Sequence, residues 1–172
     1  MAEKELESII VFTDGACTGN PGPGGWAAVI AFPDGFVKEL GGGNPATTNN
    51  RMEMVSALKA LQFLKEHTEE VVIYTDSVYL IKGITEWIWA WRSRGWKTAA
   101  GEDVSNKDLW QELFIHAGKR NDSGLEWKFV KGHSGVPGNE RCDEIAVAFA
   151  TGKRFSLYDG PLLKYPVAIY DL

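Results

Sequence analysis

Two aspartates end two similar apolar runs in this chain. Asp14 closes the run IIVFTD at residues 9–14, and Asp76 closes VVIYTD at residues 71–76. Short runs of β-branched and apolar residues are typical of buried strands. Open α/β sheets bind ligands at the carboxyl ends of their strands. If the two strands are parallel neighbours, the carboxylates meet, and their mutual repulsion favours a divalent cation between them.

Two further acids fall on predicted helices. Glu53 borders the apolar stripe of a helix predicted at 50–67, and Asp143 shares a face with Val147 in a helix predicted at 139–151. Taken singly, each has an ordinary explanation: Glu53 as a first-turn acid favoured by the helix dipole, and Asp143 as a partly exposed surface residue. Together, the four acids suit a pair of Mg²⁺ ions, with Mn²⁺ as a substitute. No Cys/His pair has zinc spacing, so zinc is not expected.

His133 lies in a glycine-containing loop ten residues before Asp143. A single loop histidine is most often inert. Beside a metal-site acid, however, it is a candidate proton carrier, because the imidazole titrates near neutral pH.

Residues 87–97 contain four of the seven tryptophans together with Arg92, Arg94 and Lys97. One interpretation is a core helix. The other is a surface for a sugar-phosphate strand, since aromatic faces with interleaved cations bind single strands of nucleic acid.

Composition narrows the class of protein. The chain has 172 residues, which suits one domain, and its net charge of −5 argues mildly against nucleic-acid binding, although a cluster of catalytic acids would itself contribute to that charge. No apolar run is long enough to span a membrane, and the N-terminus lacks a signal sequence. Two cysteines are too few for a disulfide framework, so we expect a cytoplasmic protein, and we expect a monomer.

The order of elements predicts an α/β fold. A three-strand antiparallel meander (8–13, 26–32 and 36–40) precedes two further strands (71–75 and 125–130), with helices predicted at 50–67, 77–92, 105–117 and 139–151. This is a five-stranded mixed sheet with helices on both faces. We expect a catalytic domain at 1–151 and an extension at 152–172 that packs on it, away from the acids. The apolar residues expected to dock the extension are Leu162, Leu163, Val167, Ile169 and Tyr170.

Several motifs resemble the type 1 ribonuclease H family over about residues 8–150. In chain order they are Thr13-Asp14-Gly15, Gly19 to Gly25, Thr47 to Glu53, Thr75-Asp76-Ser77, Gly95 to Thr98, Lys131 to Gly135 and Asn139 to Asp143. The resemblance implies a ribonuclease H-like fold and an endonuclease that cuts the RNA strand of an RNA–DNA hybrid.

The resemblance also implies roles for individual residues. The metal ligands would be Asp14, Glu53, Asp76 and Asp143, and His133 would assist proton transfer or product release. Hybrid contacts would come from Cys17, Asn20 and Asn49, with Thr48 in a pocket for a DNA phosphate. A basic protrusion that grips the DNA strand would contain Trp87, Trp91, Trp96 and Lys97.

Two other functions remain open at this point. One is a non-catalytic hybrid- or duplex-binding module on the same fold, which would gain nothing from four converging carboxylates that repel phosphate. The other is a metal-dependent nuclease for a different substrate, such as duplex RNA.

Overall fold

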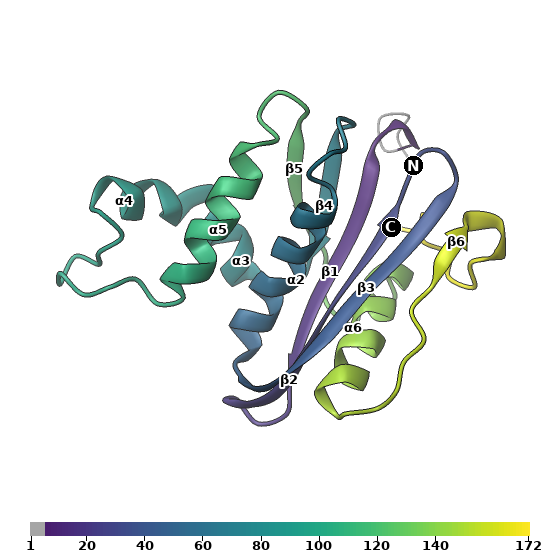
Figure 1. The fold of residues 1–172 in the computed structure, drawn as a ribbon, viewed down its shortest axis with the longest axis horizontal. Helices are drawn as coiled ribbons and strands as arrows, with labels where there is room; N and C mark the ends of the chain where they lie inside the picture. Colours follow the sequence, from purple (N-terminus) through teal and green to yellow (C-terminus); the bar gives the residue numbers. More distant parts are fainter. Residues whose placement is uncertain (1–5) are drawn as a thin grey trace.

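A six-stranded mixed sheet forms the centre of the computed structural model, which describes residues 6–172 (Figure 1). The sheet order is β5-β4-β1-β2-β3-β6, with β4 parallel to both β1 and β5 and the other neighbours antiparallel. The strands are β1 (Ile9–Cys17), β2 (Gly22–Ala31), β3 (Phe36–Thr47), β4 (Val71–Thr75), β5 (Leu125–Phe129) and β6 (Asp159–Pro161).

The predicted α/β class and mixed sheet are confirmed, but the strand number is wrong by one. The sixth strand, β6, comes from the extension and pairs with residues 36–38 of β3. Its three residues include Gly160 and Pro161, which sequence patterns assign to turns. Only the neighbouring strand makes this short segment extended.

Helices cover both faces of the sheet. They are α2 (Asn49–Phe63), α3 (Val78–Lys82), the π-helical turn η1 (Gly83–Trp87), α4 (Ile88–Ser93), α5 (Lys107–Gly118) and α6 (Pro137–Ala150), followed by the 3₁₀ turn η2 (Leu162–Lys164). α2 and α5 share one apolar core with the sheet, and α6 packs in the core on the opposite face. Within the described residues, no helix is long and apolar enough to cross a membrane.

Alternation along β1 divides its side chains between the two cores. Ile9 and Val11 contact the core beneath α2, whereas Ile10 and Phe12 contact the core beneath α6. All four are fully buried. A strand buried on both faces reads as a continuous apolar run, which is why residues 9–12 stand out in the sequence.

The helix predicted at 77–92 is interrupted. It consists of α3, η1 and α4, and the π-helical turn begins at Gly83. A Cβ atom on Gly83 would lie 2.0 Å from the ring of Trp110, so only glycine lets the two segments approach this closely. The interruption therefore follows from tertiary packing that local helix propensity does not contain.

Two glycines allow the helices to approach β1 where the acids lie. A Cβ on Gly15 would lie 2.4 Å from the backbone nitrogen of Glu53, and a Cβ on Gly138 would lie 2.5 Å from the ring of Phe12. Such distances do not occur in real proteins without a shift of the backbone. These glycines therefore set how near α2 and α6 come to the strand that carries Asp14.

The extension is joined to the domain through a buried carboxylate. Glu39 of β3 is 1% exposed and forms a two-pronged ion pair with Arg141 of α6, at 2.5 and 3.0 Å. The hydroxyl of Tyr165 donates to the same carboxylate at 2.7 Å, and the backbone N–H of Tyr158 donates at 2.8 Å. We call these four residues the Glu39 clamp. Burial opposes the charged form of Glu39, yet these hydrogen bonds lower its pKa.

The apolar residues of the extension divide between core and solvent. Ile169 is 1% exposed, and Leu162, Val167 and Tyr170 are partly buried against the α6 core. Leu163 is 99% exposed, so the expectation that it docks is wrong. It lies in the single turn η2, which places its side chain in solvent.

We predict that Tyr165→Phe destabilises the protein at neutral pH. Loss of a hydrogen bond to a buried charge costs about 2 kcal/mol, which lowers the melting temperature by roughly 4–8 °C in a chain of this size. Because the folded state lowers the pKa of Glu39, the stabilisation by its charge is lost as pH falls through that pKa. The difference between variant and wild type should therefore narrow in acid.

Thermal melting from pH 7 to pH 3 checks this prediction. Tyr170→Phe is the matched control, because the Tyr170 hydroxyl has no hydrogen-bond partner among residues 6–172. Equal melting temperatures for Tyr165→Phe and Tyr170→Phe at pH 7 would contradict the stabilising role of the clamp.

Candidate active site

The parallel pairing of β1 with β4 brings two aspartates together. Thr13 lies opposite Thr75 in the register, so Asp14 and Asp76 follow at the same level of two adjacent strands. The predicted parallel neighbourhood of these two runs is confirmed. Asp14 is 4% exposed, and Asp76 is half-buried.

Glu53 of α2 completes a group of three carboxylates. One oxygen from each of Asp14, Glu53 and Asp76 lies within 4.8 Å of the others. Glu53 is 5% exposed, so its place at the border of the apolar stripe turns it inward. The backbone N–H of Gly15 donates to Asp14 at 2.9 Å. Asp143 lies outside this close group and lines the same cleft.

The crowding of acids changes their protonation. Burial, followed by the charge of Asp76, raises the pKa of Asp14 from 3.8 to about 7. Burial and the neighbouring Asp14 raise the pKa of Glu53 well above its ordinary value. Both shifts have the cause expected of carboxylates held together in a partly dry site without a compensating cation.

The carboxylates fit a divalent metal ion. Glu53 Oε2 is buried and has no hydrogen-bond partner among the described residues. A buried carboxylate oxygen without a donor is costly unless a cation satisfies it. The ligand atoms are all carboxylate oxygens, which select hard cations such as Mg²⁺ or Mn²⁺ over zinc.

The acids lie in an open cleft of about 580 Å³. Of the residues predicted to be functional, the cleft is lined by Asp14, Cys17, Asn49, Glu53, Asp76, His133 and Asp143. These residues come from two strands or strand ends, two helices and one loop. The arrangement gathers anionic oxygens on one side and polar side chains along the rim.

His133 is held at the cleft by its loop. Its backbone is left-handed, with φ of +55°, and its side chain is exposed. The preceding Gly132 passes so close to Asp76 that a Cβ would lie 2.7 Å from Oδ2. The loop therefore reaches the acids only because residue 132 lacks a side chain.

Two residues that sequence reasoning missed also contribute to this region. Asn139, 3% exposed, points its amide Nδ2 at Asp76 Oδ2 at 3.4 Å. Tyr79 lines the cleft, and its hydroxyl accepts hydrogen bonds from Asn106 at 3.0 Å and Trp110 at 3.3 Å. The position of Tyr79, three residues after Asp76 at the start of a helix, is the one signal that could have indicated it.

Asn20 and Thr48 lie beside the cleft without lining it. The side-chain oxygen of Asn20 accepts from the backbone N–H of Asn49 at 3.1 Å. Thr48 caps α2 by accepting from the backbone N–H of Arg51 at 3.2 Å. Each side chain therefore has a structural partner in the free protein, and each fixes the segment that carries Asn49.

The tryptophan-rich segment stands apart from the sheet and forms a protrusion of residues 83–104 (Figure 1). Trp91 packs against Trp110 of α5, with ring centroids 5.4 Å apart, and Trp87 contacts Trp91 at 5.8 Å. Trp96 contacts Phe114 edge-on at 6.4 Å. The core interpretation therefore holds for part of each of these side chains, while Trp87 remains 37% exposed.

Lys97 pairs with Asp103, an acid that the sequence analysis did not single out. The ammonium of Lys97 lies 2.5 Å from Asp103 Oδ1, and Lys107 approaches the same oxygen at 3.5 Å. A phosphate at Lys97 must compete with this exposed pair. Because surface ion pairs contribute little free energy, the competition does not prevent binding.

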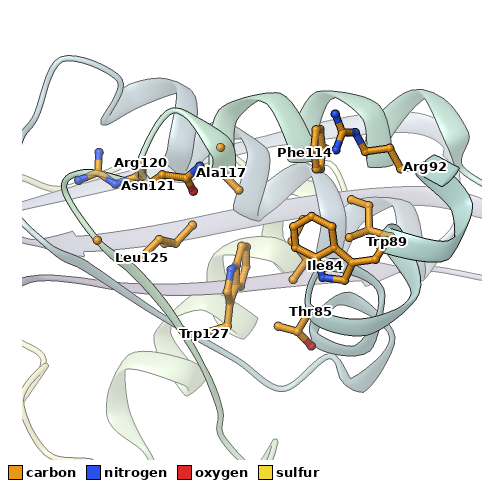
Figure 2. Close-up of a pocket in the computed structure, with 13 residues that line it drawn as sticks. Ile84, Thr85, Trp89, Arg92, Phe114, Ala117, Arg120, Asn121, Leu125 and Trp127 are labelled. Atoms are coloured by element: carbon orange, nitrogen blue, oxygen red, sulfur yellow. The ribbon is translucent and has the colours of Figure 1, made fainter.

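A larger hollow, of about 840 Å³, lies between the protrusion, α5 and β5 (Figure 2). Its lining is mainly apolar and aromatic, and the guanidinium of Arg92 lies over the ring of Phe114 at 4.6 Å. No carboxylate lines it. The acidic cleft, although smaller, is therefore the place where metal-assisted chemistry can occur.

The hollow beside α6 corrects an expectation about the extension. Lys153, Arg154 and Phe155 line a space of about 480 Å³ together with Asp143. The extension was expected to lie away from the acids, and for these three residues that expectation is wrong. The chain reverses direction after α6, which the glycine at 152 permits with φ of +72°.

Comparison with known proteins gives a consistent family. Residues 6–151 match the family model described as RNase H. A ribonuclease H of Cyanothece sp. is 54% identical over 145 residues, which cover 84% of this chain and 90% of that protein. A ribonuclease H of Thermosynechococcus vestitus is 53% identical over 149 residues, covering 86% and 91% respectively.

A solved structure agrees with the sequence comparison. LC9-RNase H1, described as a type 1 RNase H, superposes with a TM-score of 0.75 at 35% identity, covering 89% of this chain and 77% of the other. The family match ends at residue 151, so the extension at 152–172 lies beyond it.

We predict that Asp14→Asn stabilises the metal-free protein. The pKa of Asp14 is about 7 when folded and 3.8 ordinarily, so its ionisation opposes folding increasingly from about pH 4 to pH 7. The variant should gain about 1 kcal/mol or more at pH 8 and little at pH 4. Melting in EDTA across this range measures the gain.

The same experiment with metal provides a second readout. Adding Mg²⁺ should raise the melting temperature of the wild type, because an ion that binds only the folded state stabilises it, and should raise that of Asp14→Asn much less. A variant that melts below the wild type in EDTA at pH 8 would mean that the carboxylates do not repel one another.

For the protrusion, we predict that Trp91→Ala and Lys97→Ala have different effects. Trp91 packs against the core, so its truncation should lower stability by about 3 kcal/mol. Lys97→Ala should leave the melting temperature within about 2 °C, because its ion pair is exposed. It should weaken RNA–DNA hybrid binding and reduce the salt slope by about one phosphate contact. An unchanged slope would remove Lys97 from the hybrid contacts.

Proposed function

Because the chain belongs to the ribonuclease H family, we propose that it hydrolyses the RNA strand of RNA–DNA hybrids and leaves 5′-phosphate and 3′-hydroxyl ends. The single observation that carries this proposal is the group formed by Asp14, Glu53 and Asp76, whose oxygens lie within 4.8 Å of one another at the end of two parallel strands. Phosphodiester hydrolysis requires that negative charge be neutralised at such a place.

The proposed cofactor is a pair of Mg²⁺ ions, for which Mn²⁺ would substitute. Asp14, Glu53 and Asp76 would hold them, with Asp143 as a further ligand from the wall of the cleft. When bound, the ions neutralise phosphate charge and stabilise the attacking and leaving oxygens. The buried, unpartnered oxygen of Glu53 supports a role as a ligand.

The remaining residues of the cleft have separate tasks. His133 is exposed at its mouth, where its imidazole would accept or donate a proton at the reacting phosphate or assist the product in leaving. Asn49 and Cys17 line the rim, and Asn20 lies against Asn49, where they would contact the hybrid. Polar groups at this edge can sense the 2′-hydroxyls of a wide, shallow minor groove.

The rest of the substrate would be held away from the cleft. Thr48 would contact a DNA phosphate through the hydroxyl hydrogen that its capping bond leaves free. The protrusion would hold the DNA strand through Lys97 and the exposed edges of Trp87, Trp91 and Trp96.

A non-catalytic binding module is the weaker alternative. Three converging carboxylates, two of them nearly fully buried, repel a phosphate backbone unless cations are bound. A protein that only binds hybrids would gain from replacing them. In a catalytic site the acids bind the metal ions, whereas in a protein that only binds hybrids they would weaken binding by repelling phosphate.

The proposal also covers the oligomeric state, the compartment and the domain bounds of the enzyme. We infer a monomeric, cytoplasmic protein with a catalytic domain at 1–151. Support for a reducing compartment comes from Cys17 and Cys142, which are both free.

A cleavage assay tests the proposed function. The intact protein is incubated with end-labelled RNA–DNA, RNA–RNA and DNA–DNA duplexes in Mg²⁺, and the product ends are identified. We expect cleavage of the RNA strand of the hybrid alone and essentially none by Asp14→Asn. Near wild-type turnover by Asp14→Asn would overturn the metal-site assignment, and equal cleavage of RNA–RNA would overturn the substrate assignment.

We further predict that His133→Ala slows turnover without abolishing it. Loss of a proton carrier typically costs about 10²–10⁴-fold in rate, and loss of a group that assists product release costs less. Steady-state rates, single-turnover rates and hybrid Kd separate the two roles. His67→Ala, a histidine outside the cleft, is the control, and a His133→Ala rate equal to that of the control would make His133 an inert loop residue.

A further inference from the structure

After α6 the chain turns back along the helix that carries Asp143. The backbone N–H of Lys153 donates to the carbonyl of Ala148 at 2.9 Å, which closes the turn. Two residues later the ring of Phe155 lies against the guanidinium of Arg141 at 4.9 Å. Residues 153–155 therefore run antiparallel to α6, toward the end of the helix that faces the acids.

This segment is held at both ends. The turn fixes Lys153 to the last part of α6, and beyond Phe155 the chain enters the Glu39 clamp at Tyr158. Between these attachments, Arg141 of the clamp also lies against the ring of Phe155. The backbone of such a segment has a defined position relative to α6, which lowers the entropy cost of ordering it when a ligand binds.

Two cations in the segment are available to a ligand. Lys153 and Arg154 are exposed, and within residues 6–172 neither lies within 4.0 Å of a carboxylate. Glu144 of α6 lines the same hollow as these cations and approaches Arg141 at 3.5 Å. By contrast, Lys38, Lys97 and Lys107 each have an acidic partner.

The position of these cations relative to the acids is informative. Lys153 and Arg154 share their hollow with Asp143, and Asp143 also lines the acidic cleft. Lys153 is attached at the level of Ala148, five residues beyond Asp143, or about 7–8 Å along the helix axis. Phosphates along one strand of a duplex follow at about 3.4 Å of rise, so a strand running along α6 would cover this separation with roughly two phosphates.

We propose that Lys153 and Arg154 form a phosphate-binding site for the nucleic-acid strand that occupies the acidic cleft, on the side of α6. The inference rests on the proposed function and adds a substrate contact from the extension, outside the residues that match the family. In Figure 1, α4 of the protrusion and α6 lie on opposite sides of β1, the strand that carries Asp14. The hybrid is then held at both sides of the acids, and a net negative protein binds a polyanion through local cations.

A structural role is the competing explanation. Cations near the last turn of a helix interact favourably with its dipole, and Lys153 and Arg154 lie just past the end of α6. That role predicts a loss of stability upon their removal with no change in hybrid binding. A phosphate site predicts the reverse, so the two explanations separate by measurement.

The test uses the intact chain carrying Lys153→Gln and Arg154→Gln together. Hybrid Kd is measured by fluorescence anisotropy in EDTA, and KM in Mg²⁺, each at several salt concentrations. We expect Kd and KM to rise about tenfold, and the slope of log K against log salt to fall by roughly 1.4–1.8, the value for two phosphate contacts. Lys164→Gln, an exposed lysine elsewhere in the extension, controls for the loss of one exposed positive charge and should behave as wild type.

Each outcome decides whether Lys153 and Arg154 bind phosphate. A double variant with the Kd, KM and salt slope of Lys164→Gln overturns the proposal, and a lower melting temperature with unchanged binding assigns the two cations to the helix dipole. Absence of hybrid cleavage by the wild type would instead overturn the proposed function. In that case the EDTA binding measurement still decides whether Lys153 and Arg154 contact phosphate.

Discussion

The repulsion between carboxylates on two adjacent strands is the constraint on which the site depends. Parallel pairing of β1 with β4 places Asp14 and Asp76 at one level, and α2 adds Glu53 from above. The pKa of Asp14 rises to about 7, so the fold holds these groups together against their own electrostatics. The compensating free energy comes from packing, because all four residues at 9–12 are fully buried between two layers of helices.

The elements that depend on local sequence patterns could be predicted, whereas those that depend on contacts with distant residues could not. The strands β1 and β4 are buried on both faces and therefore appear in the sequence as continuous apolar runs, and Glu53 lies at the border of the apolar stripe of its own helix. The break at Gly83 and the strand β6 depend on partners far along the chain, Trp110 and residues 36–38, which no local pattern reveals. The contact of Asn139 with Asp76 was missed for the same reason.

Aromatic packing connects the acidic cleft with the protrusion. Tyr79 lines the cleft, lies 5.9 Å from Trp87 and accepts a hydrogen bond from Trp110. Trp110 is fully buried and contacts Trp91. Because these rings form one continuous cluster, the protrusion has a fixed orientation relative to the acids, although it stands away from the sheet (Figure 1). A tryptophan-rich sequence can thus serve both as core and as surface.

The short strand β6 has a consequence for behaviour at high protein concentration. A sheet edge presents unpaired N–H and C=O groups on which the edge of another molecule can dock, and such docking begins many aggregation reactions. In this fold β6 pairs with Phe36, Val37 and Lys38 at the edge of β3. Pro161, the last residue of β6, has no backbone N–H that could bond to a strand of another molecule. The extension thus also withholds residues 36–38 of β3 from pairing with the sheet of another molecule.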